Sequence, residues 1–140
     1  MRRRRFLAAA AAGTMGGLAG CGLGGGATPS GDYDVGMGAS VFKPRDLTVS
    51  VGDTVRWKNT NSRAHTVTAY GTQRPEGADY WATGDYETEE AARDGFYGSF
   101  GGAISSDQVF EHTFEVPGDH HYFCIPHERA GMVGVVVVEG

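Results

Sequence analysis

Cysteine is scarce in this chain of 140 residues, which has only Cys21 and Cys124. That scarcity excludes the framework of several disulfides that stabilises many small secreted domains. The uncharged stretch at residues 8–19 consists largely of alanine and glycine, so it is too short and too weakly apolar for a good transmembrane helix. The length predicts a single folded domain.

Basic residues are also few, and four of them lie together at residues 2–5. The whole chain has 12 Lys and Arg against 17 Asp and Glu, a net charge of −5. Without residues 2–5, 8 basic residues face 17 acidic ones, which gives a net charge of about −9. This balance argues against nucleic-acid binding, because nothing would compensate the phosphates. It also agrees with a high-salt habitat, where surplus surface carboxylates keep proteins soluble.

The first twenty residues have the pattern of an export signal. A positively charged start, residues 1–7, is followed by the apolar stretch at residues 8–19. Within this start, the segment RRRFL at residues 3–7 resembles the twin-arginine motif, which directs the export of folded proteins. We therefore expect residues 1–20 to be a twin-arginine signal peptide that is removed.

Leu18-Ala-Gly-Cys21 resembles a lipobox, in which the cysteine becomes the lipid-bearing N-terminus of the mature protein. The alternative is that Cys21 is only a small residue near an ordinary cleavage site. Because two acyl chains anchor a protein stably, a diacylglyceryl Cys21 would tether the protein to the outer face of the cell membrane. Residues 21–32 are rich in glycine, which predicts a flexible tether. The folded domain then spans residues 33–140.

Cys124, His127 and Met132 lie within nine residues of one another, with the spacing C-x2-H-x4-M. A thiolate, an imidazole and a thioether form a soft ligand set that suits copper better than a hard cation. His65, far upstream, is the natural fourth donor. Two histidines and a cysteine with a weak axial methionine describe a mononuclear blue copper site for electron transfer.

Two β-rich blocks, residues 33–70 and 108–139, flank a different middle segment. Alternating apolar residues predict half-buried strands in the first block; they are Leu47, Val49, Val51, Val55 and Trp57. Residues 65–70 and 120–124 are strand-like, and four consecutive valines strongly favour a strand near the C-terminus. These strands and turns predict an antiparallel Greek-key β-sandwich. We expect its core to include Trp57, Phe114 and Phe123.

The middle segment, residues 71–102, predicts a long loop over the outside of the sandwich. Thr88 is a candidate N-cap for a short helix that reaches Arg93 and is stopped by Gly95. The acidic side chains in this segment predict a solvated face or, alternatively, a docking patch for a basic partner; they are Glu87, Glu89 and Glu90.

The candidate ligands also have simpler interpretations. Cys124 alone could be a buried structural thiol, since free cysteine is among the most buried residue types. A Cys124–His127 nucleophile would need an orienting group and an oxyanion element, and neither is evident. An immunoglobulin-like core would need a second cysteine on an early strand. The remaining histidines are interpreted as structural or surface residues, with His112 on a solvent-facing strand; they are His112, His120 and His121.

The domain resembles the cupredoxins and, within them, the plastocyanin-like halocyanins of haloarchaea. The matching segments are Phe42-x-Pro44, Val51-Gly-Asp-Thr-Val-x-Trp57, Asn61 with His65-Thr-Val67, Phe110–Gly118 and Tyr122–Gly134. The resemblance implies a type 1 copper bound by His65, Cys124, His127 and Met132. It also implies a monomeric electron carrier, not an enzyme, that serves membrane-associated donors and acceptors of a respiratory or related chain. The alternative is a module that delivers or stores copper on the cell exterior.

Overall fold

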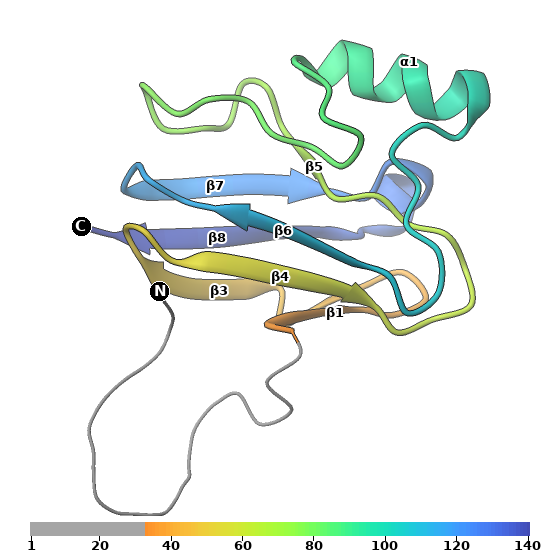
Figure 1. Ribbon diagram of the computed structural model, residues 1–140, viewed down its shortest axis with the longest axis horizontal. Coiled ribbons are helices and arrows are strands. Elements are labelled where there is room, and N and C mark those ends of the chain that lie inside the picture. Colours follow the sequence, from red (N-terminus) through yellow and green to blue (C-terminus); the bar gives the residue numbers. More distant parts are fainter. Residues whose placement is uncertain (1–32) are drawn as a thin grey trace, which may run out of the picture.

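The computed structural model describes residues 33–140, which form two four-stranded sheets packed face to face (Figure 1). The expected signal peptide, the tether and Cys21 lie outside the described residues. Within residues 33–140, no helix has the length and apolar character needed to cross a membrane.

The two sheets are mixed, with parallel and antiparallel neighbours. The first sheet has the order β2 (Phe42–Lys43), β1 (Val35–Met37), β4 (Thr54–Asn59), β6 (Val109–Thr113). The second has the order β3 (Asp46–Ser50), β8 (Val133–Glu139), β7 (Gly118–Phe123), β5 (Thr68–Ala69). The expectation of a purely antiparallel sandwich is wrong, because β1 pairs with β4 and β3 with β8 in parallel. Both parallel pairs join strands that other elements separate along the chain, as parallel pairing requires.

Strand alternation explains how the sandwich fills its interior. On β4, Val55 and Trp57 point inward and are fully buried, as their spacing predicts. Trp57 packs against Phe114 and Tyr122 with ring centroids 6.3 and 5.5 Å apart. Phe114 and Phe123 are also buried, which confirms the predicted core. Val51 is the exception in the alternating pattern: it follows β3 in a turn and is exposed.

Trp81 is the main contribution of the middle segment to the core, and only 5% of its surface is exposed. The expectation that residues 71–102 lie wholly outside the sandwich is therefore wrong. Their backbone joins β5, because the amide of Ala69 donates to the Trp81 carbonyl over 3.1 Å and a bridge pairs Thr68 with Ala82. Trp81 then packs against Trp57 with ring centroids 5.4 Å apart, between the edge strands β5 and β6.

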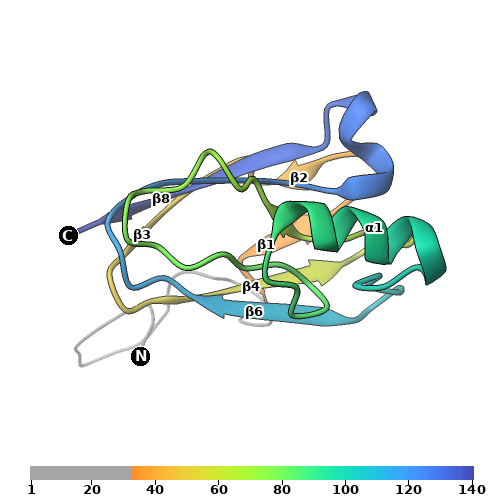
Figure 2. The ribbon, with the colours of Figure 1, turned by 90° about the horizontal axis from the view of Figure 1, so that it is seen from above.

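The single α-helix of the described chain, α1 (Glu89–Ser99), lies beside β5 and the ligand-bearing end of the sandwich (Figures 1 and 2). Thr88 caps it as predicted, its hydroxyl accepting from the amide of Ala91. The helix does not stop at Gly95. A Cβ at that position would lie 2.1 Å from the Tyr86 hydroxyl, so glycine serves close packing here. The helix ends instead at Ser99, and its C-cap Phe100 is in the left-handed region with φ 62°.

His112 on β6 is half-buried and does not point freely to solvent as expected, because it stacks on Trp81. The two rings stack with centroids 4.8 Å apart, and Phe114 meets the imidazole edge at 4.8 Å. Burial, and then the nearby charge of His120, lower the pKa of His112 to about 4. His112 is therefore a neutral structural residue at pH 7, which agrees with its interpretation from the sequence as a structural or surface histidine.

Acid should destabilise the protein through His112. Below pH 6.5 the unfolded histidine takes up a proton, whereas the folded one stays neutral until about pH 4, so stability falls across this window as the pH falls. Between pH 7 and 5 the contribution should be about 1–2 kcal/mol. We expect the free energy of unfolding of His112→Gln, measured with urea, to fall by this amount less than that of the wild type between pH 7 and 5. Equal slopes for the wild type and His112→Gln would contradict the assignment.

Candidate metal centre

Three of the predicted ligands come from the connection between β7 and β8. Cys124 follows β7, His127 lies in the short 3₁₀ helix η1 (Ile125–Ala130), and Met132 directly precedes β8. Backbone bonds close this turn: the Cys124 amide donates to the Met132 carbonyl over 3.0 Å, and the Met132 amide to the His127 carbonyl over 3.2 Å. Gly131 ends η1 with φ 91°, a conformation that glycine adopts without steric cost. The ligands are thus fixed by a closed helical turn.

His65 reaches the same end of the sandwich from the other side of the sequence. It forms an isolated bridge with Ile104, with bonds of 3.1 Å from the His65 amide and 2.7 Å from the Ile104 amide. The buried Asn59 side chain donates to the carbonyls of Ile104 and Arg63 over 2.9 and 2.7 Å. The expected strand over residues 65–70 is thus shorter, with only Thr68–Ala69 in β5. Asn59 and Ile104 position His65, and neither was a predicted site residue.

Cys124, His65 and His127 converge on one point. The Cys124 Sγ lies 3.5 Å from Nδ1 of His65 and 3.4 Å from Nδ1 of His127, and the three ligand atoms all lie within 4.8 Å of one another. Met132 is fully buried in the same core cluster as Cys124. The donor set fits copper, because it is soft, compact and largely shielded from water. His65, Cys124, His127 and Met132 are arranged as a type 1 copper site.

The burial of the site controls its protonation. Burial raises the pKa of the Cys124 thiol to about 11, against a smaller opposing effect of the Thr66 amide. Burial also lowers the pKa of His65 to about 4 and moves that of His127 below its ordinary value. Both imidazoles are therefore neutral at pH 7, the form that binds metal, whereas the thiol needs a cation to lose its proton. A metal ion at this point would take the place of that proton.

Thr66 connects the two halves of the site and was missed by the sequence analysis. Its amide donates to the Cys124 Sγ over 3.4 Å, and its hydroxyl accepts from the Ile125 amide over 2.9 Å. The same hydroxyl shares a hydrogen bond of 2.9 Å with Thr68. The sequence signal that could have indicated Thr66 is a hydroxyl side chain between the ligand His65 and the apolar Val67. Thr66 links the strand that bears His65 to the turn that bears Cys124.

Thr66→Val should destabilise the metal-free protein by about 1–3 kcal/mol, since the buried Ile125 amide loses its acceptor while the side-chain shape is kept. Urea unfolding measures this change. The control Thr48→Val alters an exposed threonine on β3 and should be close to neutral. A loss no larger than that of the control would show that the hydroxyl does not join the two segments.

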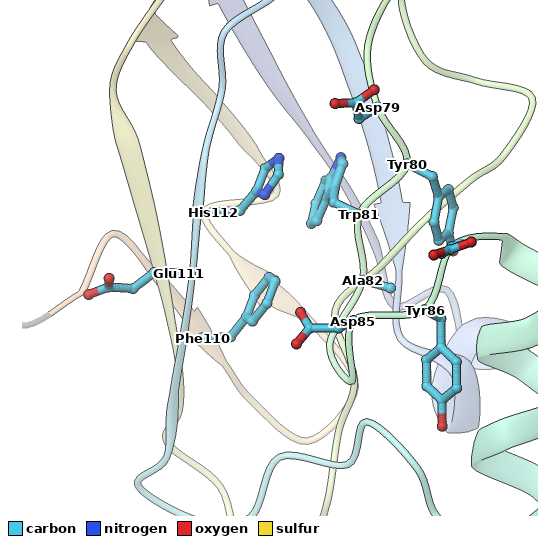
Figure 3. Close-up of a pocket in the computed structure, with 10 residues that line it drawn as sticks. Asp79, Tyr80, Trp81, Ala82, Asp85, Tyr86, Phe110, Glu111 and His112 are labelled. Atoms are coloured by element: carbon cyan, nitrogen blue, oxygen red, sulfur yellow. The ribbon is translucent and has the colours of Figure 1, made fainter.

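A cleft of about 550 Å³ lies away from the centre, between β6 and residues 79–87 (Figure 3). None of the four metal-site residues lines it. Trp81, Phe110 and His112 form part of its wall, and its carboxylates are Asp79, Asp85, Glu87 and Glu111. The acidic run expected to form one solvated face is thus divided: Glu87 lines the cleft, whereas Glu89 is paired with Arg93.

A β-sandwich with this cluster at one end defines a mononuclear copper centre. The family described as "Copper binding proteins, plastocyanin/azurin family" matches residues 30–139, and the chain belongs to that family. The fold is the cupredoxin fold and the cofactor is copper, as the sequence predicted. This also confirms the predicted relationship to the cupredoxins at the level of the plastocyanin/azurin family.

Several relatives support this placement. A plastocyanin of Synechococcus sp. (strain JA-2-3B'a(2-13)) is 33% identical over 77% of this chain and 74% of its own. The chain covers 90% of a Scenedesmus fuscus plastocyanin but 61% of the chloroplastic plastocyanin of Tetradesmus obliquus, each 29% identical. Amicyanin from Paracoccus versutus superposes with a TM-score of 0.54 at 26% identity, over 80% of this chain and 85% of that one. The purple cupredoxin of Nitrosopumilus maritimus, 21% identical with a TM-score of 0.51 over 77% of this chain and all of its own, shares the fold.

Proposed function

We propose that this protein is a membrane-anchored electron carrier of the halocyanin type, which cycles one copper ion between Cu(II) and Cu(I). The observation that carries the proposal is the buried convergence of Cys124, His65 and His127 beside Met132. Bound copper supplies a one-electron redox couple, and the protein supplies a site whose ligands need not rearrange when the electron arrives or leaves.

Each residue then has a distinct role. Cys124 is the thiolate ligand, and the amide of Thr66 tunes its electron density. His65 and His127 would hold the copper through their Nδ1 atoms, which face the sulfur. Met132 would supply a weak thioether donor that tunes the reduction potential. His127 is more exposed than the fully buried His65, so it is the ligand through which we expect electrons to enter and leave.

The burial of the ligands favours a carrier over a catalytic or delivery site. A catalytic metal site keeps a coordination position open to substrate, whereas here Cys124, His65 and Met132 have no exposed surface. A module that delivers copper needs exchangeable ligands, and buried ligands on a hydrogen-bonded turn oppose exchange. The arrangement therefore supports electron transfer between partner proteins.

The location rests on the N-terminal sequence. Export by the twin-arginine route and lipidation of Cys21 would place the domain on the outer face of the cell membrane, linked by residues 21–32. Its partners would then be membrane-associated redox proteins of a respiratory or related chain. Mass spectrometry of the mature N-terminal peptide should show a diacylglyceryl cysteine. Cys21→Ser should release the protein from membranes, and a variant that remains bound would contradict lipid anchoring.

The decisive test of the copper proposal is the visible and EPR spectrum of the mature protein with one equivalent of Cu(II). We expect an intense thiolate-to-copper absorption and slow loss of copper to a mild chelator. A colourless protein would contradict the electron-carrier proposal. Fast loss of copper from a coloured protein would favour the delivery function instead.

A further inference from the structure

Arg93 on α1 binds the copper-ligand turn directly. Its guanidinium forms a two-pronged contact with Glu128, with Nη1 2.9 Å from Oε1 and Nη2 3.3 Å from Oε2. Glu128 is the residue after His127. The same guanidinium contacts Glu89, one helical turn earlier, through Nη2 at 2.7 Å and Nε at 2.9 Å. Arg93 thus joins the helix of the middle segment to the turn that bears the ligands.

The same guanidinium also contacts the residue that precedes Cys124 at the start of the ligand-bearing turn. It lies 4.3 Å from the ring centroid of Phe123, the fully buried residue before Cys124. Tyr70 stacks on the same ring at 4.4 Å, and its hydroxyl donates to Oε2 of Glu128 over 2.6 Å. Arg93 and Tyr70 therefore contact both flanks of the segment that begins at Cys124 and includes His127.

The environment makes this network stronger than an isolated surface ion pair. The Arg93, Glu128 and Glu89 side chains are 31%, 29% and 25% exposed, and two-pronged arginine–carboxylate contacts are among the strongest hydrogen bonds. The hydrogen bond to Glu128 is the main cause that raises the pKa of Arg93 above its ordinary value. By contrast, Arg56 and Glu111 on the first sheet form a more exposed pair, 38% and 55% exposed, away from the site.

We propose that Arg93 is a positioning residue for the copper centre: through Glu128 and Phe123 it restrains the turn that carries Cys124, His127 and Met132. Its role at the metal rests on the proposed function, whereas the restraint on the turn does not depend on bound copper. Within residues 33–140, Arg93 forms no hydrogen bond or ion pair with any of the four metal-site residues, so its effect is transmitted through Glu128 and Phe123.

The first test measures amide hydrogen exchange in the metal-free protein. In Arg93→Met, the amides of Cys124, His127 and Met132 should exchange roughly tenfold faster, because a charge-assisted two-pronged contact is lost while the apolar stem remains. The amide of Trp57 should keep its rate, which separates loosening of the turn from global destabilisation. The matched control Arg56→Met breaks the remote ion pair and should leave the turn unchanged.

Glu128→Gln and the double variant test whether Arg93 acts through Glu128. Glu128→Gln should loosen the same amides, and Arg93→Met/Glu128→Gln should add little to either change, since both disrupt one contact. If Arg93→Met does not fold, Glu128→Gln carries the same measurement. Turn amides that match those of Arg56→Met, or fully additive effects in the double variant, would overturn the proposal.

The EPR spectrum of the copper-loaded protein reports on the arrangement of the ligands, which a loss of global stability alone would not change. The Cu(II) EPR spectrum of Arg93→Met should differ from that of the wild type, and the spectrum of Arg56→Met should not. An unchanged Arg93→Met spectrum would overturn positioning of the ligands. If the wild type itself gave no thiolate–copper absorption, the proposed function would fail, while the exchange test on the metal-free turn would still decide the restraint.

Discussion

Replacing Cys124 by serine should abolish the intense visible absorption of the copper-loaded protein. The absorption requires a thiolate bound to Cu(II), and Cys124 is the only cysteine within residues 33–140. A hydroxyl is a harder and weaker donor, so the site should also lose much of its preference for copper. Visible and EPR spectra of wild type and Cys124→Ser, each with one equivalent of Cu(II), measure this change.

Cys21→Ser is the matched control for that experiment. It removes the other thiol of the chain and should leave the absorption unchanged, whether or not the residue carries lipid. Persistence of the absorption in Cys124→Ser would refute the assignment of the centre.

Met132→Leu should raise the reduction potential by roughly 60 mV or more, which corresponds to a tenfold change in the ratio of reduced to oxidised protein. The thioether donates weakly to copper and stabilises Cu(II) more than Cu(I), so its loss favours the reduced state. Leucine keeps an apolar side chain of similar size in this fully buried position. Voltammetry measures the potential, and the thiolate absorption should persist because Cys124 is intact.

Met37→Leu is the control for Met132→Leu. Met37 is also fully buried, but it lies on β1 and is not a proposed ligand. Its replacement tests whether any core methionine exchange moves the potential. Equal shifts in the two variants, or no shift in Met132→Leu, would mean that Met132 is not the axial ligand.

The chemistry of the centre was predictable from sequence because most of it is local. Cys124, His127 and Met132 lie on one turn, and their spacing and softness are enough to indicate copper. The nitrogen that each imidazole presents was not predictable. It depends on ring orientation, which the bridge between His65 and Ile104 and the hydrogen-bonded turn after β7 determine.

The prediction of the fold succeeded for alternating strands and failed where distant segments meet. The burial of Val55 and Trp57 follows from the period of two residues in a strand. The parallel pairs β1–β4 and β3–β8, the insertion of Trp81 and the stacking of His112 on Trp81 have no local signal. Gly95 misled the helix prediction because its reason is contact with Tyr86, not the end of a helix.

The sequence by itself determined the ligand types, their spacing on one turn and the alternation that makes a sandwich, because each depends on residues close together in the chain. The tertiary structure alone decided what surrounds the ligands. Thr66 meets Cys124 across 58 positions and Arg93 meets Glu128 across 35, and such contacts exist only after the sheets and the helix have packed. The copper chemistry is therefore encoded locally, whereas the packing that restrains and tunes it comes from segments far apart in the chain.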